Sequence, residues 1–368
     1  MKASFLSDSL EKKLSFLNHA VSIRGQLPVL SNFLLEVKNG KLKISATDLE
    51  IGISSSIPVN AEEDGRTTVP AKNFSDLLSN LGSQKITISL EDGALKLTGE
   101  KVRAHFQTMS SEDFPKLYDE KGEEYINIKK TQAEEIFSKV VLAAAGESSR
   151  PALSGVLFDK DKKEALLVAT DGYRLSLQRS VFKTKGELKK PLVVPARIIR
   201  ELFSIREEDE NLKVFISEKN NQILFSQGET DLVGRLIDAE YPEYQKIIPL
   251  DFSTKAEIEK EEFTNAIKIC SVFARETANI IKLAVEKNKI VVSANSPSVG
   301  EDAVDVEAKT EGEENEIAFN AKYLLDILSV LDKEDLVFEM TGPLNPGVFK
   351  IKEDNTFLHL IMPIRVES

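Results

Sequence analysis

The sequence predicts an α+β protein that contains three homologous domains, each with two helices packed against antiparallel sheet. Two observations predict this fold class. A ten-residue motif occurs three times at a constant interval, and the same order of helix-like and strand-like segments accompanies each copy. At roughly 100–200 residues per domain, a chain of 368 residues has room for two or three domains.

The repeated motif has a fixed order of residue types. Each copy has an alanine followed by a cation, then an acid four residues after the cation, then two large apolar residues. Successive copies are 125 residues apart, at 69–78, 194–203 and 319–328. Because an internal repeat at a fixed period indicates repeated structural units, the motif predicts three copies of one domain.

Further landmarks recur in the same order along the chain. The segment 46–49 resembles 169–172, the segment 28–32 resembles 151–155, and Phe114-Pro115 resembles Tyr241-Pro242. The polar connectors between the repeats place the domain boundaries near residues 125 and 252. The predicted domains are 1–125, 126–252 and 253–368.

Each predicted domain opens with a helix, because apolar residues recur there at intervals of four, three and four. These stripes are Leu10/Leu14/Leu17/Val21, Ala133/Phe137/Val140/Ala144 and Phe263/Ile267/Cys270/Ala274.

Alternating apolar and polar residues predict strands at 42–46 and 85–90. Asp92-Gly93 follows the second run and is typical of a tight hairpin turn. Each copy of the repeated motif then predicts a second, short helix. Since strands and helices do not alternate as βαβ units, a parallel Rossmann sheet is excluded.

Composition narrows the class of protein further. No apolar run approaches the ~20 residues that span a bilayer, and the first 21 residues lack the features of a secretory signal. The single cysteine, Cys270, and three separated histidines predict neither a disulfide framework nor a metal site. No phosphate-binding loop or hydrolase motif occurs. We therefore expect a cytoplasmic, non-catalytic protein without cofactor or metal.

The distribution of charge bears on nucleic-acid binding. The formal net charge is −12, which disfavours nonspecific binding to DNA. Basic residues nevertheless lie on the predicted helices, outside the apolar stripes, among them Lys12, Lys139 and Lys268 on the opening helices. A cation also occurs at the same motif position in every repeat, as Lys72, Arg197 and Lys322. Either these side chains are merely solvated, or the helices together form a basic surface that holds duplex DNA through its phosphates.

The segment 169–175, Ala-Thr-Asp-Gly-Tyr-Arg-Leu, resembles the bacterial sliding clamps, the beta subunits of the replicative DNA polymerase III. The resemblance covers the whole chain and includes 24–32, 238–244 and 362–365. It implies a head-to-tail homodimeric ring of the DNA clamp fold, whose helices line a hole around duplex DNA. It also implies a processivity factor that tethers the DNA polymerase III catalytic subunit and other polymerases and repair proteins, and that a separate ATP-dependent clamp loader opens.

The resemblance also assigns residues to three surfaces. Arg24 and Arg197 match DNA-contacting cations, and Lys12 and Lys72 join them because of their place on predicted helices. Phe106, Val272 and Phe273 match the dimer interface. A peptide-binding cleft would be formed by Leu153, Thr170, Gly172, Tyr173, Arg174, Leu175, Pro242, Ile247, Asn320, Tyr323, Leu344, Met362, Pro363, Ile364 and Arg365.

Two other functions compete with the clamp. The first is an acidic repeat scaffold that binds peptide motifs without encircling DNA, which the net charge would favour. The second is a hydrolase that uses Asp171, although an aspartate beside a glycine is usually a turn residue.

Overall fold

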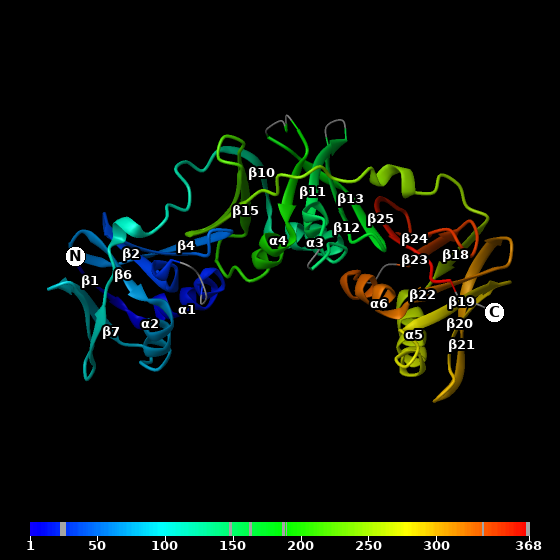
Figure 1. Cartoon of the computed structure of the whole chain (residues 1–368), viewed down its shortest axis with the longest axis horizontal. Coiled ribbons are helices and arrows are strands. Elements are labelled where there is room, and N and C mark those ends of the chain that lie inside the picture. Colours follow the sequence, from blue (N-terminus) through cyan, green and yellow to red (C-terminus); the bar gives the residue numbers. More distant parts are fainter. Residues whose placement is uncertain are drawn as a thin grey trace. The chain divides into compact units, whose positions relative to one another are not determined.

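The computed structural model (Figure 1) describes residues 1–22, 27–146, 149–161, 164–185, 188, 190–332 and 335–365. The chain divides into two compact units. The first contains Met1–Thr131, Thr184–Glu187 and Arg197–Leu236, and the second contains Gln132–Lys183, Leu188–Ala196 and Ile237–Ser368. The middle third of the chain therefore contributes to both units.

The first unit contains two antiparallel sheets, with the strand orders β5-β1-β7-β8-β9 and β10-β15-β16-β17-β4-β3-β2-β6. Helices α1 and α2 contact each other, and α1 also contacts β4. Phe33 and Phe74 are fully buried among these elements. The helices are α1 (Ser7–Leu17), α2 (Ala71–Ser79) and, from Arg197 onward, α4 (Ala196–Leu202), with 3-10 turns η1 (Asn18–Ala20), η2 (Pro28–Ser31) and η3 (Ser111–Asp113). The strands are β1 (Lys2–Leu6), β2 (Asn32–Lys38), β3 (Lys41–Thr47), β4 (Ile51–Pro58), β5 (Asn60–Glu63), β6 (Gly65–Pro70), β7 (Lys85–Glu91), β8 (Ala94–Thr98), β9 (Arg103–Gln107), β10 (Glu123–Lys129), β15 (Asn211–Ser217), β16 (Gln222–Gln227) and β17 (Thr230–Arg235).

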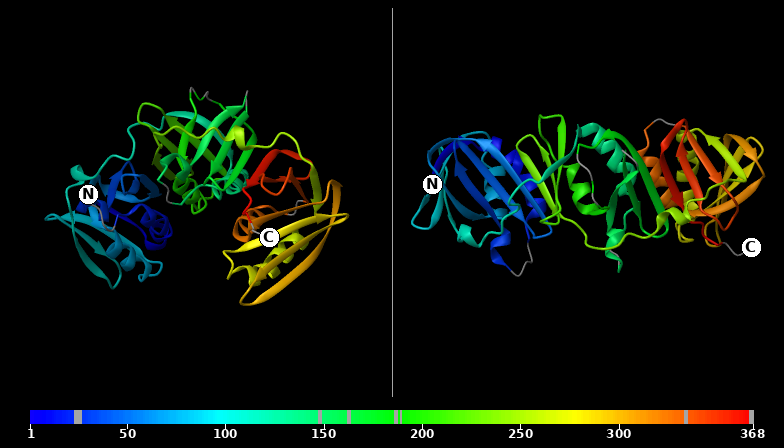
Figure 2. Two further views of the ribbon diagram at one scale, coloured as in Figure 1. Left: turned by 45° about the vertical axis from the view of Figure 1, so that its right-hand side comes forward. Right: turned by 90° about the horizontal axis from the view of Figure 1, so that it is seen from above.

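The second unit contains one continuous chain of strand pairs, β14-β11-β12-β13-β25-β24-β23-β18-β21-β20-β19-β22. Helices α5 and α6 lie side by side and pack on strands of this sheet, as both views of Figure 2 show. The helices are α3 (Lys130–Val141), α5 (Lys260–Ala274) and α6 (Ala321–Val330), with 3-10 turns η4 (Pro151–Ser154) and η5 (Tyr244–Ile247). The strands are β11 (Gly155–Asp161), β12 (Glu164–Thr170), β13 (Arg174–Lys183), β14 (Leu192–Pro195), β18 (Thr254–Ile258), β19 (Ile280–Glu286), β20 (Lys289–Ser296), β21 (Gly300–Gly312), β22 (Asn315–Asn320), β23 (Leu336–Met340), β24 (Gly347–Ile351) and β25 (Asp354–Ile361).

The repeated motif forms the same local structure in all three copies. A strand ends at the residue before the alanine, and α2, α4 and α6 begin at Ala71, Ala196 and Ala321. In the third copy, the side chain of Asn320 caps the helix by accepting a hydrogen bond from the Lys322 backbone N–H at 2.9 Å. The second predicted helix of each repeat is therefore confirmed.

The opening helices are confirmed, but two of them are shorter than their apolar stripes. Helix α1 ends at Leu17, and Val21 lies in extended backbone after a 3-10 turn. Helix α3 ends at Val141, before Ala144, although Ala144 is buried. In α5 all four stripe residues are helical and buried, including Cys270. Burial alone does not distinguish a final helical turn from a following turn that packs on the same core.

A glycine at the end of β21 gives a test of this fold. Gly312 has φ +88°, and a Cβ atom there would lie 2.0 Å from the backbone oxygen of Ser253. An alanine at this position would clash with a backbone atom, which cannot move without shifting the chain, and would be strained at positive φ. Gly312→Ala is therefore expected to lower the free energy of unfolding by about 2 kcal/mol or more. Chemical denaturation measures this loss. The matched control is Gly342→Ala, where the nearest atom lies 3.7 Å away and a loss of similar size would contradict the explanation.

Candidate functional site

A tight turn joins β12 to β13 at the segment that carries the family resemblance. The Thr170 hydroxyl donates to the Arg174 carbonyl at 2.7 Å, and the Gly172 N–H donates to Thr170 Oγ1 at 3.1 Å. Asp171 Oδ1 accepts from the N–H groups of Tyr173 and Arg174, at 2.9 and 3.0 Å. Gly172 has φ +93°, a conformation that favours glycine. The turn leaves Tyr173 65% exposed and uses Asp171 as a structural acceptor, as the turn interpretation of Asp171 predicts.

Arg174 is buried and joins this turn to helix α6. Its Nε donates to Asp171 Oδ2 at 3.0 Å, and its Nη1 donates to Asp326 Oδ2 at 2.6 Å. The guanidinium carbon lies 4.6 Å from the ring centre of Tyr323, within the range of a cation–π interaction. Asp326 was missed by the sequence reasoning about the site, although it is the recurring acid of the repeated motif.

An apolar cluster lies beneath the turn. Leu175 is fully buried in it, and Tyr241 and Met362 pack against its edge. The Tyr241 hydroxyl donates to the Val168 carbonyl at 3.3 Å, and burial raises the pKa of Tyr241. The buried members are Leu157, Leu166, Val168, Leu175, Leu177, Val193, Tyr244, Val348 and Leu360. This cluster gives the surface around Tyr173 a rigid apolar base.

The chain after β25 runs along the same turn. The Met362 N–H donates to the Tyr173 carbonyl, and the Ile364 N–H donates to the Ala318 carbonyl, both at 2.8 Å. Met362, Pro363 and Ile364 are half-buried, whereas Arg365 is exposed. The structure thus brings the C-terminal group of predicted cleft residues to the turn at 170–174.

The other predicted cleft residues have different surroundings. Pro242, Ile247 and Leu344 are exposed, and Ile247 and Leu344 are large apolar side chains that are 42% and 59% accessible. Leu153 and Leu175 are buried, so their side chains support the surface from below.

His359 is a buried residue that the sequence reasoning did not place in the site. It lies on β25, and its Nδ1 is 2.7 Å from Ser176 Oγ. Burial, with the nearby Arg174 cation, lowers the pKa of His359 from 6.5 to about 3. No sequence pattern distinguishes it from a surface histidine in an alternating strand.

The low pKa of His359 predicts a pH dependence of stability. Between about pH 6.5 and pH 3 the unfolded chain binds a proton at this position and the folded chain does not, so stability falls as pH falls. Across this window His359→Gln is expected to remove about 1 kcal/mol of pH dependence per pH unit. Urea denaturation of both proteins from pH 7 to pH 4.5 measures the two slopes. Parallel curves would contradict the prediction.

The predicted DNA-contacting residues differ in their environment. Arg24 lies outside the described residues, and Lys12 and Lys72 are exposed on α1 and α2. Arg197 forms ion pairs with Asp48 at 2.7 Å and Glu50 at 3.5 Å. Lys139, which the sequence places on a polar face, is instead buried and paired with Glu135 at 2.9 Å, because the aliphatic part of a lysine packs readily in an apolar contact.

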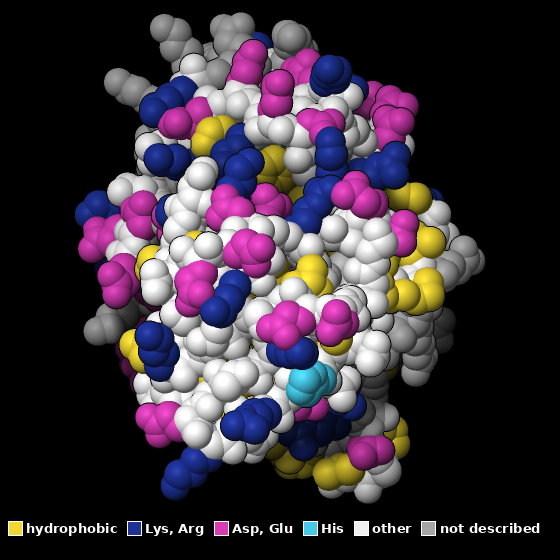
Figure 3. Space-filling model, turned by 90° about the vertical axis from the view of Figure 1, so that its left-hand side faces the viewer, with side chains coloured by type: hydrophobic (Ala, Val, Ile, Leu, Met, Phe, Trp, Pro, Cys, Tyr) yellow, Lys and Arg dark blue, Asp and Glu magenta, His cyan; other side chains and the backbone are white. Residues whose placement is uncertain are grey.

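Lys12 borders a hollow in the first unit. The hollow has a volume of about 300 Å³ and includes Lys13 and the exposed Arg206, with Lys13 paired to Glu207 at 2.5 Å. On the face of the first unit that Figure 3 turns toward the viewer, basic and acidic side chains are interleaved.

Two strand edges carry the predicted interface residues. β9 is the last strand of its sheet, and its Phe106 packs edge-on against Phe74 with ring centres 5.6 Å apart. Among the described strands, residues 300–307 of β21 pair only with β20, so their other edge is open. Phe273 lies beside the start of β21, 3.9 Å from where a Cβ of Gly300 would be, and Val272 is 55% exposed. Each unit therefore has an open strand edge flanked by apolar side chains.

Comparison with known proteins identifies the family. The models of the N-terminal, central and C-terminal domains of the DNA polymerase III beta subunit match residues 1–118, 127–243 and 245–365 in order. The chain belongs to the DNA polymerase III beta-subunit family. It is 27% identical over 358 residues to the beta sliding clamp of Staphylococcus aureus, covering 94% of each chain.

Solved structures of the beta-subunit family agree with this assignment. The sliding clamp of Bacillus subtilis is 27% identical and superposes with a TM-score of 0.94, and the beta subunit of Pseudomonas aeruginosa is 25% identical with a TM-score of 0.93. Both comparisons cover 100% of each chain. The α+β clamp fold predicted from sequence is thus confirmed.

Among the described residues, no group of three or more His, Cys, Asp or Glu side chains is placed to hold a metal ion. None of the helices in the described part of the chain has the length and apolar character needed to cross a membrane.

Proposed function

We infer that this chain is the DNA replication clamp of its bacterium, a non-catalytic processivity factor. The observation that carries this conclusion is the ordered match of three beta-subunit domain models along almost the whole chain. Members of this family form homodimeric rings on DNA and bind DNA polymerase III, the clamp loader and other clamp-binding proteins. A closed ring stays on DNA by topology, so each contact with a phosphate can be weak and the ring can slide.

The proposed ring closes head to tail, with β9 of one copy beside residues 300–307 of β21 of the other. Open strand edges are prone to pair, and these two edges have opposite charge. β9 carries Arg103 and His105, whereas β21 carries Glu301 and Asp302. Both carboxylate oxygens of Asp302 are buried, and the neighbouring Cys270 thiol is neutral, so a cation from a second copy would balance the carboxylate charge. Phe106, Val272 and Phe273 would add the apolar contact.

The proposed DNA contacts are Lys12, Lys72, Arg24 and Arg197. Lys12 and Lys72 are exposed and free to approach phosphates, and Lys12 adjoins the hollow that contains Arg206. Arg197 already has two carboxylate partners, so it would contribute less to DNA binding than Lys12 or Lys72. Such contacts read no base sequence, in keeping with sliding.

The proposed peptide-binding site is the surface around Tyr173, Arg174, Tyr323 and Met362. Exposed aromatic and aliphatic groups beside a buried ion-pair network suit a short linear motif with an apolar anchor, because buried aromatic and aliphatic anchors provide most of the affinity of so small an interface. Polymerases and repair proteins would compete for this surface.

The proposal keeps the three domains 1–125, 126–252 and 253–368. It also includes a cytoplasmic location, since bacterial chromosomes are replicated there and the single Cys270 is suited to a reducing compartment.

Retention on DNA tests the clamp function. The protein is loaded onto nicked circular DNA with the matching loader and ATP, then passed over a gel-filtration column at high salt before and after linearisation. A topological ring is expected to stay on the circle and leave the linear form. A protein bound only by charge would be stripped from both forms by salt, and peptide binding without retention on circles would favour the acidic scaffold.

A further inference from the structure

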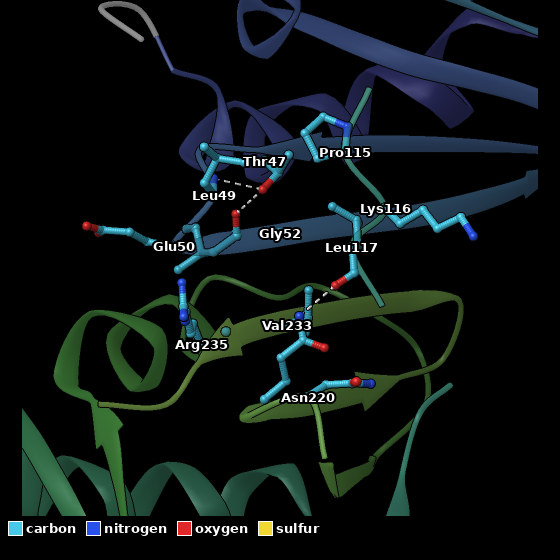
Figure 4. Close-up of a pocket in the computed structure, with 13 residues that line it drawn as sticks. Thr47, Leu49, Glu50, Gly52, Pro115, Lys116, Leu117, Asn220, Val233 and Arg235 are labelled. Carbon is cyan, nitrogen blue, oxygen red and sulfur yellow. Dashed lines mark hydrogen bonds between the residues drawn. The ribbon is translucent and has the colours of Figure 1, made fainter. Parts of the chain in front are cut away.

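A pocket of about 230 Å³ lies in the first unit beside the paired ends of β4 and β17 (Figure 4). Three segments form it: the turn that leads into β4, the segment 115–117, and the strands β16 and β17 with the turn before them. The Gln222 amide donates to the Leu117 carbonyl at 3.0 Å and holds the second segment in place. This volume is below the ~300 Å³ of small-molecule sites and suits one or two side chains of a peptide.

The turn at this pocket has the same hydrogen bonds as the turn at 170–174. Thr47 Oγ1 donates to the Ile51 carbonyl at 2.8 Å and accepts from the Leu49 N–H at 3.0 Å. Asp48 Oδ1 accepts from the N–H groups of Glu50 and Ile51, at 3.0 and 2.9 Å. Each bond has its counterpart in the second repeat, so the turn geometry that presents Tyr173 occurs again here.

The strand beside the turn also repeats the arrangement. The Arg235 N–H donates to the Glu50 carbonyl at 3.1 Å, just as the Met362 N–H donates to the Tyr173 carbonyl. The pairing of β17 with β4 corresponds to the pairing of β25 with β13. Asn220 lines the pocket, and Asn345 stands 125 residues later, at the interval of the repeated motif.

The backbone at the mouth of the pocket is strained. Leu49 has φ +78°, at the position where the second repeat has Gly172. A left-handed leucine costs about 1–2 kcal/mol, yet its side chain is 54% exposed and gains little from burial. Exposed apolar side chains in strained backbone are found at binding sites, and here the leucine borders the pocket.

The side chains at the pocket define the chemistry of its ligand. Leu117 and Val233 approach Gly52 so closely that a Cβ there would lie 2.7 and 2.9 Å from them, and they form an apolar patch in a pocket whose other lining residues are largely polar. Arg235 is exposed and has no ion pair within the described residues, whereas the nearby Glu50 carboxylate pairs with Arg197 at 3.5 Å. An aliphatic group and an anion would therefore be bound side by side.

We propose that the pocket beside the paired ends of β4 and β17 is a second peptide-docking site, which binds an extended segment of another protein with an aliphatic residue next to an acidic one. The geometric match with the surface around Tyr173 means that the proposal rests on the peptide-binding function proposed there. The two sites differ in charge, because Arg235 stands where the other site has Met362. They would therefore select different segments.

Site-specific fluorescence separates binding at the two sites. Burial raises the pKa of the Cys270 thiol to about 12, so a cysteine introduced at the surface is labelled selectively. Asn220→Cys places an environment-sensitive dye at the pocket, and Asn345→Cys places the same dye next to Leu344, a residue of the proposed cleft. The probe is the peptide Gly-Ser-Leu-Asp-Leu-Gly, compared with its neutral version Gly-Ser-Leu-Asn-Leu-Gly.

The proposal predicts a saturable change of the dye at position 220, with at least fivefold weaker binding of the neutral peptide. Arg235→Glu should weaken binding of the acidic peptide at least tenfold, whereas the same charge change at the exposed Lys213, outside the pocket, should alter it less than twofold. No response at position 220, or equal effects of the two substitutions, would overturn the proposal. As a control, a peptide from the clamp-binding segment of the polymerase catalytic subunit should still change the fluorescence of the dye at position 345, which would show that the first site is intact. If neither dye responds to its peptide, the result would instead count against the proposed peptide-binding function.

Discussion

Replacing Val272 with aspartate is expected to abolish retention of the loaded protein on nicked circular DNA and to leave a folded monomer. Val272 is 55% exposed on α5 beside the open edge of β21, where the proposed interface would enclose it. A carboxylate enclosed there without a partner would cost several kcal/mol, and each loss of about 1.4 kcal/mol weakens the dimer tenfold. Sedimentation velocity and the gel-filtration assay measure the two effects.

Leu250→Asp is the matched control for this substitution. Leu250 is 96% exposed in the connector before β18, so the same new charge stays in water and the dimer should persist. A dimeric Val272→Asp protein that still stays on circular DNA would exclude this face as the interface. An unfolded protein would be recognised by circular dichroism, and Phe106→Asp then tests the opposite edge.

Arg174→Ala is expected to weaken binding of a clamp-binding motif peptide at least tenfold and to lower the free energy of unfolding by about 3 kcal/mol. The substitution leaves Asp171 and Asp326 without the buried cation that pairs with both, and removing one partner of a buried pair typically costs 3–5 kcal/mol. It also removes the guanidinium stacked on Tyr323. Fluorescence anisotropy and urea denaturation measure the two changes.

Two variants separate the parts of this prediction. Arg174→Lys keeps the charge but cannot donate to both carboxylates in the same planar geometry, so it should recover only part of the stability. Lys213→Ala removes an exposed cation on β15 and should leave both quantities unchanged. Wild-type peptide affinity in Arg174→Ala would remove Arg174 from the peptide-binding site.

The repeated motif shows how far local sequence determines structure. In all three copies the helix starts at the alanine. The residues that determine this start, the apolar positions of the helix and the last residue of the preceding strand, lie within a few positions of one another. The hairpin at Asp92-Gly93 is predicted equally well, since both residues adopt the left-handed conformation that such turns require. Local rules fail at Val21 and Ala144, which continue the apolar stripes but lie beyond the ends of the helices.

The site depends more strongly on distant residues. The sequence identifies the turn at 170–174 because its hydrogen bonds are local and leave a recognisable pattern of Thr, Asp and Gly. It gives no sign that Asp326 pairs with Arg174 across 152 positions, or that His359 lies buried against Ser176. These pairs are set by how β13, β25 and α6 pack, and pairing between side chains far apart in sequence leaves no periodic trace.

By itself, the sequence determined the three repeats, the α+β class, the family and the presence of two helices in each repeat, because each of these rests on local patterns that recur along the chain. Only the tertiary structure decided that Lys139 is buried, that Arg197 is already paired, and that the strained Leu49 borders a pocket built like the surface around Tyr173. The physical reason is that burial and ion pairing depend on which elements, distant in sequence, pack against each other. The free energy of those contacts is gained only when the chain is folded.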